Sequence, residues 1–176
     1  MKEKVMTKAV VFDFDDTLAT TDCRVIVRRQ NGRGNRGLPV RKLTPAEFNS
    51  AVLDHLEEWY DFSEFRSEEF IRKANPTYLM ALAKEVYAEN HSVYILTART
   101  DDVAGAIIDF LADCDVKPVR VFGVGSDTKK VDIAEEKQKV LSTLTQAFDI
   151  VYFYDDSEEN CDLARGIGNG IKVYLV

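Results

Sequence analysis

Two pairs of aspartates follow short apolar runs, and their type and spacing suit chemistry that is assisted by a metal ion. Asp13 and Asp15 follow a run near the start of the chain, and Asp155 and Asp156 follow another near its end. Carboxylates that converge on one site repel each other unless a cation lies among them. Oxygen ligands of this kind, completed by water and a phosphate group, suit Mg²⁺. We therefore expect these four residues to form a Mg²⁺ site that receives a phosphorylated ligand, although Asp156 alone is also consistent with a helix cap or a solvated loop acid.

Apolar runs also predict the strands that bring these aspartates together. From residue 77 to the end of the chain, such runs alternate with helical patterns. This alternation predicts an α/β fold, a Rossmann-like three-layer sandwich with a mostly parallel five-stranded sheet and right-handed crossovers. Ligands of such folds bind beyond the carboxyl ends of the strands, which is where the aspartates lie. The predicted strands are Ala9–Phe12, Val93–Leu96, Val119–Phe122, Ile150–Tyr154 and Ile171–Leu175.

A hydroxyl and a cation follow the second predicted strand, in the segment Thr97-Ala98-Arg99. A guanidinium can hold two phosphate oxygens at once, so Arg99 is a candidate substrate clamp, with Ala98 beside it. Arg99 is also consistent with an ordinary ion pair to Asp101 or Asp102.

The first strand is separated from the helix predicted to start at Pro76 by about 60 residues, which is too long for a simple connection. We expect one domain that spans the whole chain, with a small flap or cap inserted at residues 18 to about 75. Val25–Arg29 and Leu38–Lys42 predict a hairpin within this insertion. Thr44-Pro45-Ala46-Glu47 has the form of a capping box and predicts a helix that continues to about Glu57.

The segment from Phe12 to Leu18, Phe-Asp-Phe-Asp-Asp-Thr-Leu, resembles the first motif of the haloacid dehalogenase (HAD) superfamily. The other strand ends match its later motifs in the right order over almost the whole chain. The pattern is most similar to small members typical of phages and, more distantly, to the phosphatase domain of phage polynucleotide kinase. The resemblance implies a phosphatase in which Asp13 is the nucleophile and forms an aspartyl-phosphate, while Asp15 is the general acid and base.

The resemblance also assigns roles to residues elsewhere in the chain. Thr97 binds the phosphoryl group, and Mg²⁺ is held by Asp13, the backbone carbonyl of Asp15 and the acidic pair at 155–156, in which either Asp155 or Asp156 is the direct ligand. Thr17 either orients Asp15 or satisfies a turn. A lysine on the helix before the fourth strand completes the family pattern; Lys137 has the best spacing, and Lys139 and Lys130 are rivals. The second aspartate, Asp15, favours phosphoester hydrolysis over dehalogenation or ion pumping.

A basic island lies within the expected insertion. Seven bases and no acid occur from Arg24 to Lys42, whereas the whole chain has a net charge of −7. Arg28 and Arg33 are therefore candidate contacts to a phosphorylated polyanion, such as a nucleic-acid end or a nucleotide. The alternative is a solvated hairpin whose arginines neutralise nearby acids. The aromatic residues that follow are consistent with base stacking or with a small core under the flap; they are Trp59, Tyr60, Phe62 and Phe65.

Composition excludes several classes of protein. With 30 acids against 23 bases in 176 residues, the chain lacks the basic coat of a general nucleic-acid-binding protein. Its longest uncharged stretch, Ala74 to Ala83, is too short for a membrane span, and we expect no membrane partner. Three distant cysteines and a start without a signal-peptide pattern favour a reduced, cytoplasmic setting. Nothing in the sequence indicates an oligomeric state.

Two other function classes share parts of this pattern. One is a non-catalytic module that binds nucleic acid through the arginines; the retention of Asp15 beside Asp13 argues against it. The other is a phosphoacceptor domain that resembles response-regulator receivers, but their phosphorylated aspartate follows the third strand, not the first. Phosphotransfer to an acceptor other than water is also consistent with the sequence.

Overall fold

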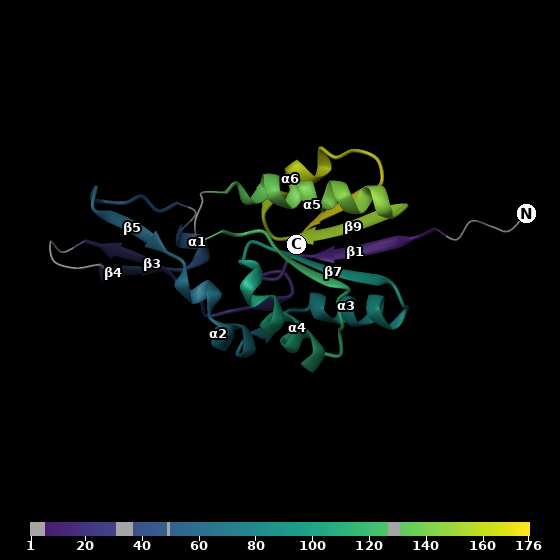
Figure 1. The fold of residues 1–176 in the computed structure, drawn as a ribbon, viewed down its shortest axis with the longest axis horizontal. Helices are drawn as coiled ribbons and strands as arrows, with labels where there is room; N and C mark the ends of the chain where they lie inside the picture. Colours follow the sequence, from purple (N-terminus) through teal and green to yellow (C-terminus); the bar gives the residue numbers. More distant parts are fainter. Residues whose placement is uncertain (1–5, 31–36, 49, 127–130) are drawn as a thin grey trace, which may run out of the picture.

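The computed structural model describes residues 6–30, 37–48, 50–126 and 131–176. Figure 1 shows a central sheet with helices on both sides, and a smaller sheet that lies beyond one end of it. None of the helices in these ranges is both long enough and apolar enough to cross a membrane.

The central sheet has five parallel strands in the order β10-β9-β1-β7-β8. This confirms the predicted α/β class and the five-stranded parallel sheet. The two strands that carry the aspartates, β1 and β9, are neighbours, so their carboxyl ends meet. The strand bounds are β1 Lys8–Phe12, β7 Ser92–Thr97, β8 Arg120–Gly123, β9 Ile150–Asp155 and β10 Ile171–Leu175.

Two helix pairs cover the two faces of the sheet (Figure 1). Alternate residues of β1 enter different cores, because successive side chains of a strand point to opposite faces. Val10 and Phe12 pack in the core under α3 and α4, whereas Ala9 and Val11 pack in the core under α5 and α6. The helices are α3 Leu79–Ala88, α4 Ala104–Asp113 (preceded by a 3₁₀ turn, Asp101–Val103), α5 Ile133–Ala147 and α6 Glu158–Arg165.

The segment between β1 and α3 forms the smaller sheet. β3 (Val25–Arg29) lies between β4 (Leu38–Leu43) and β5 (Glu58–Asp61), and both pairings are antiparallel. The predicted hairpin is thereby confirmed, with its tip at residues 31–36 outside the described ranges. At the base of this insertion, β2 (Ala19–Thr20) pairs with β6 (Asn75–Pro76). A 3₁₀ turn, Ser63–Arg66, and α2, Glu68–Arg72, lead back to the main body.

The predicted helix from Thr44 to Glu57 is wrong beyond its first turn. The capping box forms, with Thr44 and Glu47 exchanging hydrogen bonds, but α1 covers only Pro45–Phe48. The apolar residues beyond it, such as Val52 and Leu56, are exposed and have no surface on which to bury a helical face. The chain instead extends into β5, which completes the small sheet.

Candidate active site

Lys137 lies between two aspartates from neighbouring strand ends. Its ammonium donates hydrogen bonds to Oδ1 of Asp13 at 2.6 Å and to Oδ2 of Asp155 at 2.7 Å. All three residues are buried, because α5 packs on the sheet through the face that carries Lys137 and Leu141. Among the described residues, no donor forms a hydrogen bond to the other oxygen of this carboxylate, Oδ2 of Asp13.

The structure distinguishes two of the three candidate lysines by whether they contact the aspartates. Lys137 is at the aspartates, whereas Lys139 is exposed and pairs with Glu136 at 2.7 Å. Lys130 lies outside the described residues.

Burial and charge set the protonation of this cluster. Burial raises the pKa of Asp13 well above its usual value, and Asp155 adds to the rise, while Lys137 opposes it. Burial lowers the pKa of Lys137, but the charges of Asp13 and Asp155 outweigh burial, and the net effect is to raise it. The lysine therefore stays cationic in a site that has an excess of carboxylates.

Asp155 is held in place by the start of α6. Its Oδ1 accepts from the backbone N–H of Ser157 at 2.9 Å, and the Asn160 amide donates to Oδ1 at 3.0 Å and to Oδ2 at 3.2 Å. Ser157 also caps α6 by accepting from the N–H of Asn160. The sequence analysis did not identify Asn160. The sequence signal for Asn160 is its position in the first turn of the helix that follows the acidic pair.

A tight turn after β1 fixes the direction of the next acids. Asp16 has a φ of 58°, and its N–H donates to the carbonyl of Ala19, while the N–H groups of Leu18 and Ala19 donate to the carbonyl of Phe14. Phe14 is fully buried. This turn leaves Asp13 and Asp15 on the site side of the loop and exposes Asp16.

Asp15 forms a bidentate ion pair with Arg99. Nε and Nη2 of Arg99 donate to Oδ2 and Oδ1 of Asp15 at 2.8 and 2.7 Å. The sequence offered Arg99 as a phosphate clamp or as a partner of Asp101 or Asp102. The structure instead pairs it with an acid 84 residues earlier in the chain.

The other expected substrate contacts surround this pair. Thr97 is buried at the end of β7, and its hydroxyl accepts from the N–H of Arg99 at 3.1 Å. Ala98 is exposed next to it. Thr17 is fully buried, and its hydroxyl has no hydrogen-bond partner within the described ranges, so it forms a hydrogen bond neither to Asp15 nor to a turn carbonyl there.

Four of the five described cations of the basic island pair with acids of the same insertion, whereas the side chain of the fifth, Arg24, donates to the carbonyl of Cys23. Arg28 pairs with Asp61 across β3 and β5, and Arg29 pairs with Glu58 at 2.6 Å. Arg41 and Lys42 pair with Asp54 and Glu64, at 3.3 and 2.8 Å. These contacts match the alternative in which the arginines neutralise nearby acids. Arg33 lies outside the described residues.

The aromatic residues of the insertion contact one another. Phe48 meets Tyr60 and Phe62 edge to face, at 4.9 and 5.3 Å between ring centroids, and Phe62 lies 6.4 Å from Phe65. They form a partly exposed cluster, because Phe62 is exposed and Phe48, Tyr60 and Phe65 are half-buried; Trp59 is also exposed.

No family model matches the sequence, and no curated protein matches it. Among solved structures, a chain of the "Pnkp1/Rnl/Hen1 complex" has a similar fold, with a TM-score of 0.60 and 15% identity over 97% of this chain and 46% of that chain. The HAD domain of the effector protein Lem4 from Legionella pneumophila, an inactive mutant, matches with a TM-score of 0.53 and 14% identity, over 97% of this chain and 86% of that chain. A HAD-superfamily hydrolase from Geobacter sulfurreducens matches with a TM-score of 0.51 and 13% identity, over 95% of this chain and 88% of that chain. The protein spans less than half of the matched chain from the Pnkp1/Rnl/Hen1 complex.

These superpositions include almost the whole chain, insertion and central sheet together. The chain has the haloacid dehalogenase fold. The fold agrees with the resemblance of the segment around Asp13, and at 13–15% identity the likeness extends to the fold alone.

The haloacid dehalogenase fold implies a Mg²⁺ site, and the donor chemistry here fits one. In the described part of the chain, no three His, Cys, Asp or Glu side chains are already grouped around a metal position. The carboxylates at the ends of β1 and β9 nevertheless outnumber the cations that contact them. Partial burial and the charge of Asp155 raise the pKa of Asp156 to about 6, and the pKa of Asp13 is raised as well. Such uncompensated oxygen donors suit a hard divalent cation.

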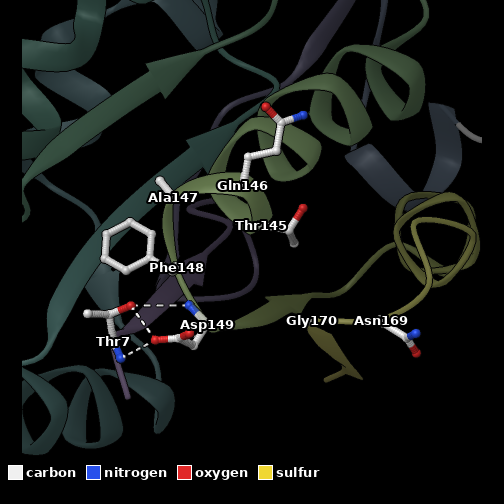
Figure 2. A pocket seen from close by; sticks show the side chains of 8 residues that line it. All are labelled: Thr7, Thr145, Gln146, Ala147, Phe148, Asp149, Asn169 and Gly170. Carbon is white, nitrogen blue, oxygen red and sulfur yellow. Dashed lines mark hydrogen bonds between the residues drawn. The ribbon is translucent and has the colours of Figure 1, made fainter. Parts of the chain in front are cut away.

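A shallow hollow lies at the opposite edge of the sheet, among residues that precede the parallel strands (Figure 2). Its carboxylate, Asp149, accepts hydrogen bonds from the N–H and the hydroxyl of Thr7, both at 2.9 Å. Asp13 and Asp155 lie at the other, carboxyl ends of β1 and β9, so the hollow is not the candidate active site. It is lined by Thr7, Thr145, Gln146, Ala147, Phe148, Asp149, Asn169 and Gly170.

Proposed function

We propose that this protein is a Mg²⁺-dependent phosphohydrolase that acts through an aspartyl-phosphate on Asp13. The observation that carries the proposal is the buried Lys137 ammonium between Asp13 and Asp155. This contact orients the Asp13 carboxylate through one oxygen and leaves the other oxygen without a described donor. A carboxylate held in this way is suited to nucleophilic attack.

The reaction proceeds in two displacements. In the first, Oδ2 of Asp13 forms a bond to phosphorus while the bond from phosphorus to the ester oxygen breaks. The departing oxygen takes a proton from Asp15. In the second, a water oxygen forms a bond to phosphorus while the bond from phosphorus to Oδ2 of Asp13 breaks. The water gives a proton to Asp15, so the free Asp13 carboxylate and the protonated Asp15 are both restored for the next turnover.

The residues around Asp13 supply binding and charge. Lys137 neutralises charge between the two carboxylates as an anionic phosphoryl group approaches. The Thr97 hydroxyl, at the end of β7, binds a phosphoryl oxygen. Asp13, Asp155, Asp156 and the backbone carbonyl of Asp15 would hold Mg²⁺, which would supply further electrostatic stabilisation of the phosphoryl group.

We further propose that residues 18–75 act as a small cap and that phosphorylated nucleic-acid ends or nucleotides are the substrate class. The support is the basic island in the insertion, with Arg28 and Arg33 as contacts to the polyanion. The ion pair between Arg28 and Asp61 leaves the Arg28 side chain 27% exposed, so part of this side chain lies at the surface.

The first experiment measures release of p-nitrophenol from p-nitrophenyl phosphate, with and without Mg²⁺. We expect Mg²⁺-dependent turnover that Asp13→Asn abolishes and Asp15→Asn lowers by about 10²–10⁴-fold. Asp109→Asn, an exposed carboxylate of α4, is the matched control and should leave the rate unchanged. No turnover by the wild type, or turnover indifferent to Asp13, would overturn the proposal. A phosphorylated Asp13 that persists would favour the phosphoacceptor alternative.

The substrate class is tested with oligonucleotides that carry a 3′- or 5′-phosphate. Arg28→Ala and Arg33→Ala should lower kcat/KM on the oligonucleotide more than on p-nitrophenyl phosphate. Arg72→Ala, an exposed arginine of α2 that pairs with Glu68, is the control. Equal losses on both substrates would remove the support for nucleic acid.

A further inference from the structure

Arg99 joins the end of β7 to both the Asp15 loop and the insertion. It is only 3% exposed. Besides Asp15, it donates through Nη1 to the carbonyl of Phe65, and its Nη2 lies 3.3 Å from Oγ1 of Thr21 and 3.5 Å from Sγ of Cys23. Three segments that are distant in sequence therefore meet at one guanidinium.

Aromatic rings and a backbone contact hold this guanidinium in one position. Its central carbon lies 5.8 Å from the centroid of the Phe14 ring and 5.4 Å from that of Phe65. The backbone N–H of Arg99 donates to Thr97. To clamp a substrate phosphate, Arg99 would have to give up its contacts with Asp15 and Phe65, so its geometry favours a different role.

The contacts of Arg99 define the direction of the Asp15 carboxylate. Both oxygens accept from Arg99, and Oδ1 also accepts from the Thr21 hydroxyl at 3.3 Å. The Asp15 side chain remains 24% exposed, which leaves an accessible edge. A displacement of about 1 Å in a reacting group lowers rates by about 100-fold, so a fixed carboxylate has kinetic value.

We propose that Arg99 is a positioning residue that aims Asp15 at the leaving oxygen, and that the insertion fixes Arg99 through Thr21, Cys23 and Phe65. This inference rests on the proposed phosphohydrolase function. In the first displacement, one oxygen of Asp15 carries the proton and gives it to the departing ester oxygen, while the other oxygen stays on Arg99. The insertion is thus part of the proton-transfer apparatus.

The test compares two phosphate esters that differ in how much they need the proton. Dinitrophenolate leaves without taking up a proton, whereas the alkoxide of glycerol phosphate needs a proton in order to leave. Arg99→Lys retains the charge but not the two-pronged contact, so we expect kcat/KM on glycerol phosphate to fall about 100-fold. On dinitrophenyl phosphate it should change by less than about threefold. Asp15→Asn should show the same selectivity, and the double variant should be no slower than Asp15→Asn, because both changes disable one function.

A clamp role gives a different pattern and would overturn the inference. Arg99→Lys would then lower kcat/KM equally on both esters, and inorganic phosphate would inhibit the variant more weakly than the wild type. Losses that add in the double variant would contradict the inference in the same way. A wild type inert on both esters would overturn the phosphohydrolase proposal and this inference with it, whereas an active wild type with equal losses overturns the inference alone.

A second pair of variants keeps the test decisive if Arg99→Lys fails to fold, as judged by its thermal unfolding. Thr21→Val removes the hydroxyl beside Asp15 and Arg99 without changing the size of the side chain. It should lower kcat/KM on glycerol phosphate severalfold and spare dinitrophenyl phosphate. Thr20→Val is the matched control, because the Thr20 hydroxyl donates to the carbonyl of Asn75 and not to the site. An unchanged ratio of the two esters in Thr21→Val would overturn the role of the insertion.

Discussion

Replacing Lys137 by methionine should destabilise the fold strongly, because it leaves two buried carboxylates without their common cation. Lys137 is 2% exposed, and Asp13 and Asp155 are 4% and 0% exposed. Removing one partner of a buried charge cluster costs about 3–5 kcal/mol. For a chain of this size, each kcal/mol lowers the midpoint of thermal unfolding by about 2–4 °C, so we expect a fall of about 6–20 °C.

Differential scanning calorimetry of four proteins checks this reasoning: the wild type, Lys137→Met, Asp13→Asn and the double variant. Asp13→Asn should be less harmful in the Lys137→Met background than in the wild type, with a coupling of about 1–3 kcal/mol. Lys139→Met, on the exposed side of the same helix, should shift the midpoint by less than about 2 °C. A Lys137→Met midpoint within about 2 °C of the wild type, or strictly additive effects of the two changes, would refute the reasoning.

The sign of the pH dependence gives a second check on this variant. The pKa of Asp13 is already raised by burial, and Lys137 opposes the rise. Without Lys137 that pKa rises further above its value in the unfolded chain. The folded state then binds more protons than the unfolded state, so stability increases as the pH falls. The deficit of Lys137→Met should therefore be smaller at pH 5 than at pH 7.

Three further predictions concern other parts of the molecule. Mg²⁺ at ten times its dissociation constant should raise the unfolding midpoint of the chelator-treated protein by about 3–6 °C, and Asp155→Asn should abolish the shift; an equal shift in the variant would contradict the assigned site. The hydrogen bond from Arg29 lowers the pKa of Glu58. The ionised Glu58 therefore stabilises the fold at pH values above its unfolded-state pKa, and this stabilisation should be lost as the pH falls below about 4. Circular dichroism against pH should show this loss in the wild type and a weaker dependence in Glu58→Gln; identical profiles would argue against it. Thr17→Val should leave the unfolding midpoint within about 2 °C of the wild type, because the buried Thr17 hydroxyl has no described hydrogen-bond partner, and a fall of more than about 4 °C would show that the hydroxyl is bonded.

The sheet and its aspartates were predictable because their signals are local. A strand buried on both faces is a short apolar run, and the residue that follows it lies at the edge of the sheet where the other strands also end. The adjacency of β1 and β9 then places Asp13 beside Asp155. The family resemblance implied a lysine on the helix before the fourth strand, and Lys137 had the best spacing to Asp155 and Asp156. In the structure Lys137 contacts Asp155.

The partners of Arg99 and of the basic island were not predictable in this way. Arg99 pairs with an acid on another strand end, so the neighbouring Asp101 and Asp102 were misleading candidates. Strand pairing in the insertion brings Glu58 and other acids opposite the arginines, although the two sets are separate in the sequence. The helix after Pro45 was overestimated because a capping box starts a helix but does not supply a surface for its apolar face.

The most direct test of the central claim is to look for the covalent intermediate on Asp13. Asp15→Asn protein is mixed with dinitrophenyl phosphate and Mg²⁺, quenched in acid, and digested for mass spectrometry. We predict one added phosphoryl group on the peptide that contains Asp13, and none in the Asp13→Asn control. An unmodified Asp13 in protein that releases dinitrophenolate, or a phosphoryl group on another residue, would contradict the account.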